Sequence, residues 1–86
     1  MGLADIKALL GKGKVVIGTD RTLKSLRKGL LAKVFLASNT KEETRQSIVK
    51  YAELAGVKVE ILDVPNDELG TACKKPFSIS VIGVLK

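Results

Sequence analysis

The stretch KVVIGTDRTLKSLRKGLLAKVFLAS, residues 14–38, decides the fold class of this chain. Its two ends, KVVIG (14–18) and KVFLAS (33–38), are short apolar runs that predict buried strands. Between them, RTLKSLRKGL (21–30) repeats leucine every three or four residues, which predicts an amphipathic helix. Its expected apolar face comprises Leu23, Leu26 and Leu30. A strand–helix–strand unit of this kind predicts an α/β domain.

The face of this helix opposite the leucines is basic. It carries Arg21, Lys24 and Lys28, with Arg27 alongside. Just before the helix, Gly18 lets the backbone approach a partner closely, and Thr19 is the expected N-cap. Open first-turn amides, the positive end of the helix dipole and nearby lysines favour an anion site. Asp20 adds an acceptor that suits the amino groups of bases. The alternative is an ordinary capped surface helix.

Outside this unit, the sequence predicts three more helices and two more strands. The helices are expected at 3–10, 41–55 and 66–73, and the strands at 57–62 and 80–85. The order is a helix, three strand–helix pairs and a final strand, which implies a sheet with helices on both faces. We therefore expect a single domain over residues 1–86.

Several details of these elements are also predicted. Thr40 and Glu43 form a T-x-x-E capping box before the helix at 41–55, and Gly56 is its expected C-terminal stop. The buried face of that helix is expected to comprise Ile48, Tyr51, Ala52 and Ala55. In the strand at 57–62, one face is expected to hold Val57, Val59 and Ile61.

Composition excludes several classes of protein. The chain is 45% apolar and 28% charged, which is typical of a globular domain. No apolar run approaches the roughly 20 residues of a membrane span, so no membrane partner is expected. There is no histidine, and Cys73 is the single cysteine. An internal disulfide, a Cys/His zinc site and histidine-based catalysis are thereby excluded, and we expect a cytoplasmic protein without a cofactor or metal.

The net charge of +6 is confined to the first two-fifths of the chain. Residues 1–34 hold eight basic and two acidic side chains, whereas residues 35–86 hold seven of each. This asymmetry favours a surface that faces a polyanion. Solubilising charge without a partner is the alternative interpretation.

Two sequence features could indicate an enzyme, but neither has the surroundings that catalysis requires. GKGK, residues 11–14, lacks the G-x-x-x-x-G-K-[ST] pattern of a phosphate loop, and it follows a predicted helix rather than a strand. Cys73 lies on the apolar face of its short helix, where a buried hydrophobe is expected rather than a nucleophile. We predict a protein that is not an enzyme.

A second candidate binding segment lies in ACKKPFSIS, residues 72–80. Pro76 marks a loop, because it has no backbone N–H to donate in a sheet. Phe77 follows two lysines there, and an exposed aromatic ring among cations suits stacking on unpaired bases. The candidate contacts in this loop are Lys74, Lys75, Pro76, Phe77 and Ser78. The alternative is that Phe77 folds back onto the core.

The sequence resembles a known family over nearly its whole length. GKVVIGTDRTLKSLRKG, SNTKEETRQSIVKYAELAGVKV and ELGTACKKPFSISVIGV are similar, in order and spacing, to kink-turn-binding ribosomal proteins. ELGTAC, followed by a basic pair and a phenylalanine, resembles the large-subunit protein thirty-e branch. The compact length and IGTDRTLKSLRKG also resemble the short seven-Ae-like bacterial paralogues.

The resemblance implies a fold, a ligand and a site. The fold is a three-layer α/β/α sandwich around a four-stranded mixed sheet. The ligand is a kink-turn, a sharply bent RNA internal loop with tandem sheared G·A pairs, here in ribosomal RNA. The family's G-x-N-E-x-x-K element aligns with residues 18–24, where Gly18 and Lys24 match but Asp20 and Arg21 replace Asn and Glu. Residues 74–78 fall on the family's second RNA-contacting loop.

The residues expected to contact RNA are therefore Gly18, Thr19, Asp20, Arg21, Lys24, Arg27, Lys28, Lys74, Lys75, Pro76, Phe77 and Ser78. The expected setting is the large ribosomal subunit, with other ribosomal components as partners and a monomer in isolation. Two alternatives stay open. One is a kink-turn binder of another ribonucleoprotein or an auxiliary ribosome-associated paralogue, and the other is a protein-interaction module of the same fold without RNA binding.

Overall fold

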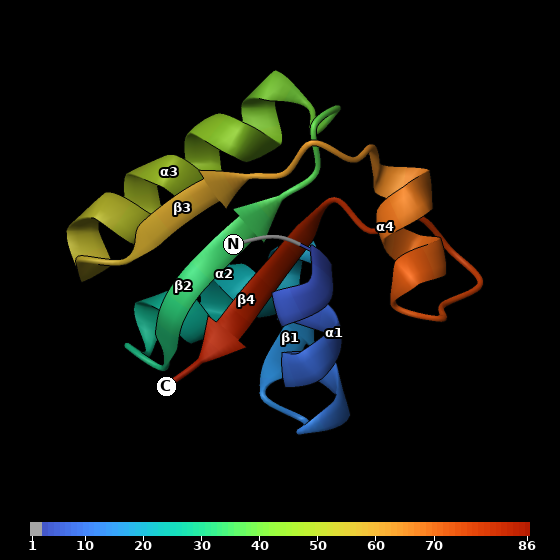
Figure 1. The fold of residues 1–86 in the computed structure, drawn as a ribbon. Coiled ribbons are helices and arrows are strands. Elements are labelled where there is room, and N and C mark those ends of the chain that lie inside the picture. The colour runs from blue at the N-terminus through green and yellow to red at the C-terminus, as the bar shows by residue number, and fades with distance from the viewer. Residues whose placement is uncertain (1–2) are drawn as a thin grey trace.

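The computed structural model describes residues 3–86, which form four helices and four strands in the predicted order (Figure 1). The elements are α1 (Leu3–Gly11), β1 (Val15–Ile17), α2 (Thr19–Arg27), β2 (Leu31–Leu36), α3 (Glu42–Ala55), β3 (Lys58–Ile61), α4 (Asn66–Ala72) and β4 (Val81–Leu85). The order expected from hydrophobic periodicity is confirmed along the described chain.

The four strands form one mixed sheet in the order β1-β4-β2-β3. The last strand, β4, is central and pairs antiparallel with both β1 and β2. The edge strand β3 runs parallel to β2, to which it is joined through α3. The chain therefore brings its C-terminal strand back between two strands of the opening strand–helix–strand unit.

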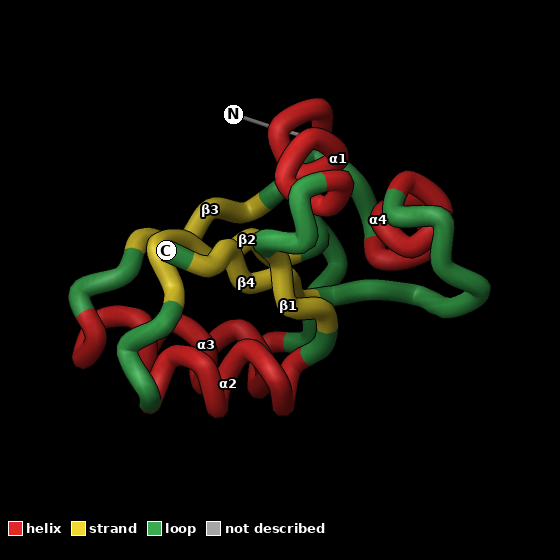
Figure 2. The backbone as a smooth tube through the Cα atoms, turned by 90° about the horizontal axis from the view of Figure 1, so that it is seen from below, coloured by secondary structure: helices red, strands yellow, loops and turns green. Residues whose placement is uncertain are grey.

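The helices cover both faces of the sheet, so the predicted three-layer sandwich is confirmed. Figure 2 shows α2 and α3 on one face and α1 and α4 on the other. Each face has its own apolar cluster. Side chains alternate between the clusters along β4, since Ile82 and Val84 face α1 and α4 whereas Val81 faces α2 and α3.

The start of α3 differs from the expected capping box. Its N-cap position is Lys41, and no side chain caps the helix. The Thr40 hydroxyl instead donates to the carbonyl oxygens of Ala37, at 2.8 Å, and of Ser80, at 3.2 Å. Thr40 therefore ties the loop after β2 to the segment before β4, and this tertiary contact replaces the local cap. Gly56 ends the helix in the left-handed conformation, as predicted.

Three expected positions of side chains are wrong. Leu30 lies beyond the end of α2 and is 48% exposed, and Ala55 is exposed at the last position of α3. Ile61 is 51% exposed at the end of an edge strand, although Val57 and Val59 pack on the α2–α3 side as expected. These three residues stand at element ends, where the neighbouring layer no longer covers them.

Glu60 on β3 forms an ion pair across the sheet. It is partly buried, and its carboxylate lies 3.4 Å from the Lys33 ammonium group on the neighbouring strand β2. The pair follows from the parallel register, in which Glu60 lies opposite Phe35, two positions from Lys33.

Candidate nucleic-acid interface

The junction between β1 and α2 is a tight reversal of direction at Gly18. This residue has φ 107° and ψ 154°, a backbone conformation that residues other than glycine rarely adopt. Its N–H donates to the carbonyl of Val81 on β4 at 3.0 Å, which fixes the start of α2 against the sheet. Gly18 also takes the N-cap position that was expected for Thr19, which becomes the first helical residue. Because no side chain caps α2, its first amides are not occupied by a capping group.

The second candidate segment is the loop between α4 and β4. Its backbone is anchored at both ends, because the Lys75 N–H donates to Gly70 at 3.0 Å and the Ile79 N–H donates to Asn66 at 3.0 Å. The loop also lies directly against α4: a Cβ on Gly70 would stand 2.0 Å from the carbonyl oxygen of Phe77. The position of this loop therefore depends on the absence of a side chain at Gly70 of α4.

Phe77 is 56% exposed, as its position between a proline and the following strand predicted. Lys74 and Lys75 are exposed beside it. The core of the α1–α4 side is closed instead by other residues, among them Ile79 and Phe35. The alternative in which Phe77 folds back onto the core is therefore wrong.

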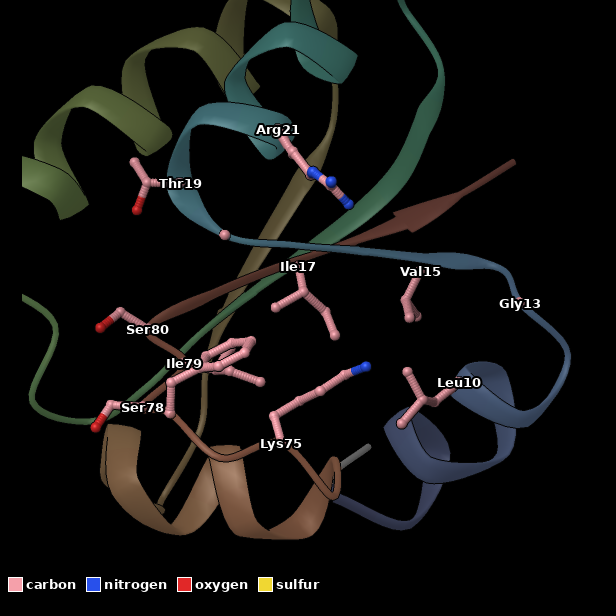
Figure 3. Close-up of a pocket in the computed structure, with 12 residues that line it drawn as sticks. Leu10, Gly13, Val15, Ile17, Thr19, Arg21, Lys75, Ser78, Ile79 and Ser80 are labelled. Atoms are coloured by element: carbon pink, nitrogen blue, oxygen red, sulfur yellow. The ribbon is translucent and has the colours of Figure 1, made fainter.

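The two segments meet at one open pocket of about 640 Å³. Its lining residues are Leu10, Gly13, Val15, Ile17, Gly18, Thr19, Arg21, Lys75, Phe77, Ser78, Ile79 and Ser80. Figure 3 shows Arg21 and Lys75 extending toward the cavity from opposite sides, one from α2 and one from the loop after α4. Two segments more than fifty residues apart in the sequence are thus brought together by the placement of β4 beside β1.

The structure gathers half of the expected contact residues at this pocket. The six are Gly18, Thr19, Arg21, Lys75, Phe77 and Ser78. The other six do not line it: Asp20, Lys24, Arg27, Lys28, Lys74 and Pro76. All of these are exposed, so they remain available to a ligand larger than the pocket.

Arg27 differs from the other basic residues of α2 because it has a partner within the protein. Its guanidinium lies 5.1 Å from the centre of the Tyr51 ring on α3, and its Nη2 donates to the Tyr51 hydroxyl at 3.5 Å. This contact helps join α2 to α3 and is a cation–π interaction. The basic face of α2 therefore has one side chain whose position is held by packing.

Six lining residues were missed by sequence reasoning, namely Leu10, Gly13, Val15, Ile17, Ile79 and Ser80. The alternation along β1 separates Val15 and Ile17 from Val16, which packs on the α2–α3 side. That alternation is visible in the sequence. It could not indicate which face of β1 borders an opening, because this depends on how far α1 and α4 cover the sheet.

The lining of the pocket favours an anionic or hydrogen-bonding ligand. Its charged residues, Arg21 and Lys75, are both cations, and hydroxyl groups come from Thr19, Ser78 and Ser80. Among residues 3–86, no group of three or more His, Cys, Asp and Glu side chains could hold a metal ion. Cys73 is buried, and its burial raises the pKa of the thiol, which disfavours the nucleophilic thiolate. No helix in the described part of the chain has the length and apolar character to span a bilayer.

Fold and pocket together define a class: a small α/β/α sandwich with a cationic pocket where the start of α2 meets the loop after α4. The chain belongs to the ribosomal protein L7Ae/L30e/S12e/Gadd45 family, whose model matches residues 2–86.

Large-subunit proteins of archaea are similar to this chain. Large ribosomal subunit protein eL30 of Sulfurisphaera tokodaii is 38% identical over 82 residues, a match that covers 95% of this chain and 77% of that protein. The eL30 protein of Pyrobaculum neutrophilum is 40% identical over 81 residues, covering 94% and 80%. These matches confirm the resemblance to this family and, within it, to the thirty-e branch.

Two solved structures share the fold at 20% sequence identity. A protein of unknown function from Bacillus halodurans superposes with a TM-score of 0.89 and covers 98% of this chain and 83% of its own. A 15.5 kD RNA-binding protein from Giardia lamblia superposes with a TM-score of 0.82, covering 98% and 70%.

Proposed function

We propose that this protein is an RNA-binding structural component of the large ribosomal subunit. In this role it recognises and stabilises a kink-turn-like bent internal loop of ribosomal RNA and catalyses no reaction. It acts in the cytoplasm on the ribosome, beside other ribosomal components, and is a monomer in isolation. The observation that carries the proposal is the meeting of two segments at one cationic pocket, in a chain that is similar to archaeal large-subunit proteins. The residues that meet there are Gly18, Thr19, Arg21, Lys75, Phe77 and Ser78.

Each part of the proposed interface has a distinct role. The backbone at Gly18 and Thr19 approaches the RNA, while Arg21 and Lys75 provide cations on two sides of the pocket. Phe77 offers an exposed ring on which an unpaired base can stack. The remaining exposed cations neutralise phosphates outside the pocket: Lys24, Arg27, Lys28 and Lys74.

Asp20 and Arg21 stand where the family pattern has Asn and Glu. Arg21 lines the pocket, whereas Asp20 is exposed outside it. An arginine there reads guanine edges or phosphate through its bidentate donors, which a glutamate cannot do. This departure favours, as a second candidate, an auxiliary ribosome-associated paralogue that binds a different bent RNA. Cosedimentation with assembled large subunits separates the two: a core component stays bound through a salt wash, whereas an auxiliary protein is released.

The affinity for RNA should fall linearly with salt on logarithmic axes. If three to five of the basic side chains at the interface neutralise phosphates, the slope should be about −2 to −4.5, because each neutralised phosphate releases condensed counterions. Filter binding or fluorescence titration of a kink-turn RNA between roughly 0.05 and 0.2 M salt measures this slope. An affinity that does not change across this range would contradict the proposed interface.

Phe77→Ala should weaken RNA binding by about 1–3 kcal/mol, the typical value of one aromatic–base stack. Its effect on the free energy of unfolding should be small, because the ring is 56% exposed and lies outside both apolar clusters. RNA titration and thermal melting of the same variant measure both quantities. A variant that binds RNA as tightly as the wild type would contradict the stacking role of this ring.

A further inference from the structure

The turn between α1 and β1, residues 12–14, together with the end of α1, forms a third side of the pocket. Leu10 and Gly13 line the cavity, although neither was expected at a binding site. In Figure 3 they lie at the end of the cavity away from Ser78 and Ser80, and the Lys75 side chain extends toward that end. A ligand that passes Lys75 therefore next meets this turn.

The backbone of the turn is held in place by its own hydrogen bonds. The N–H groups of Lys12 and Lys14 both donate to the carbonyl of Leu9, each at 3.1 Å. The carbonyl of Lys14 accepts from Leu85 at the end of β4, at 2.9 Å, which ties the turn to the central strand. The backbone is thus ordered before any ligand arrives, whereas the Lys12 and Lys14 side chains are exposed on either side of Gly13.

The charge of this turn is uncompensated. No acidic residue occurs between Asp5 and Asp20, a stretch that includes Lys7, Lys12 and Lys14. Within residues 3–86, neither Lys12 nor Lys14 forms an ion pair; the ion pairs seen there join Lys33 to Glu60 and Arg45 to Glu42. Closing a turn requires glycine but not two flanking lysines. These two cations are therefore free to bind an anionic chain that crosses the rim of the pocket.

We infer that the α1–β1 turn is a third RNA-contacting segment, in which Lys12 and Lys14 bind phosphates of the strand that leaves the pocket past Lys75. This inference rests on the proposed RNA-binding function. An ammonium group is a compact charge with donors only, so it neutralises phosphate without selecting a base sequence. The turn thereby extends the footprint and fixes the direction of the strand, while the pocket and Phe77 provide selectivity.

The test compares two double variants that each remove two positive charges. Lys12→Gln with Lys14→Gln alters the turn, whereas Lys50→Gln with Lys58→Gln alters exposed lysines of α3 and β3 that do not line the pocket. The probe is a kink-turn RNA stem with tandem G·A pairs, titrated at several salt concentrations. A further variant, Lys12→Arg with Lys14→Arg, retains the charge. Thermal melting of each variant reports whether the fold is kept.

The turn variant should show a salt slope shallower by about 1.4–1.8, which corresponds to two lost phosphate contacts at about 0.7–0.9 each. Its affinity at about 0.1 M salt should be on the order of tenfold lower or more, whereas the control and the arginine variant should keep the wild-type slope. A turn variant that binds like the control, when the wild type binds RNA, overturns this inference and leaves the proposed function intact. A wild-type protein that does not bind the probe overturns both.

Discussion

Replacing Leu26 by alanine should lower the free energy of unfolding by about 2–5 kcal/mol. Leu26 is 3% exposed on the inner face of α2, in the cluster that also contains Val34 and Ile48. Its truncation removes buried apolar contacts and leaves a space that the sheet cannot fill. For a domain of this size, 1 kcal/mol corresponds to about 4–8 °C in melting temperature, so thermal melts alone should detect the loss.

Lys24→Ala is the matched control, because Lys24 lies two residues earlier on the same helix and is exposed. Its effect on the free energy of unfolding should be below about 0.5 kcal/mol, while its affinity for RNA should decrease through a lost phosphate contact. If both variants melted at the same reduced temperature, the assignment of inner and outer faces of α2 would be wrong.

Gly70→Ala should destabilise the protein by about 3 kcal/mol, at the upper end of the usual cost of overpacking. The new Cβ would stand 2.0 Å from the backbone oxygen of Phe77 and 3.1 Å from its carbonyl carbon. A change of rotamer cannot relieve a contact with backbone, so the loop that carries Phe77 and Ser78 must move away from α4. RNA affinity should fall with stability, because the same loop forms one side of the pocket. Chemical denaturation and RNA titration measure the two losses.

Gly11→Ala provides the control for Gly70→Ala. Gly11 also lies in a helix, at the end of α1, and a Cβ there would meet no atom within 4 Å. Alanine is favoured over glycine in helices by up to about 1 kcal/mol, so this variant should be neutral or stabilised. Equal stability of the two variants would show that the position of the loop does not depend on the absence of a side chain at Gly70.

The secondary structure was predictable because its signals are local. Leucine spacing along 21–30 and apolar runs such as VVI (15–17) express the helical and strand periods directly, and α2 and β1 form at these places. The ends of elements were predicted less well. Thr19 and Thr40 have the side chains of N-caps, yet Gly18 takes the first position and Ser80 and Ala37 compete for the second hydroxyl. Whether a hydroxyl caps a helix depends on which hydrogen-bond partner lies closest to it in the folded protein. That partner can be distant in the sequence.

The candidate site divides in the same way. Charge asymmetry, the glycine before α2 and the aromatic ring among lysines indicated two segments, and both are exposed as predicted. Their meeting at one pocket depends on β4 lying between β1 and β2. No periodicity specifies that order, because strand pairing joins residues far apart in the chain. For the same reason the sequence could not show that Leu10 and Gly13 border the pocket, or that Lys28 does not.

The amino-acid order alone therefore establishes an α/β domain with helices on both faces of its sheet, a basic N-terminal part and an exposed aromatic loop, because periodicity and charge are properties of neighbouring residues. The tertiary structure alone decides the strand order, the helix caps and the pocket. These depend on contacts such as that between Gly70 and Phe77, or between the Gly18 amide and Val81, which exist only when separate layers pack together.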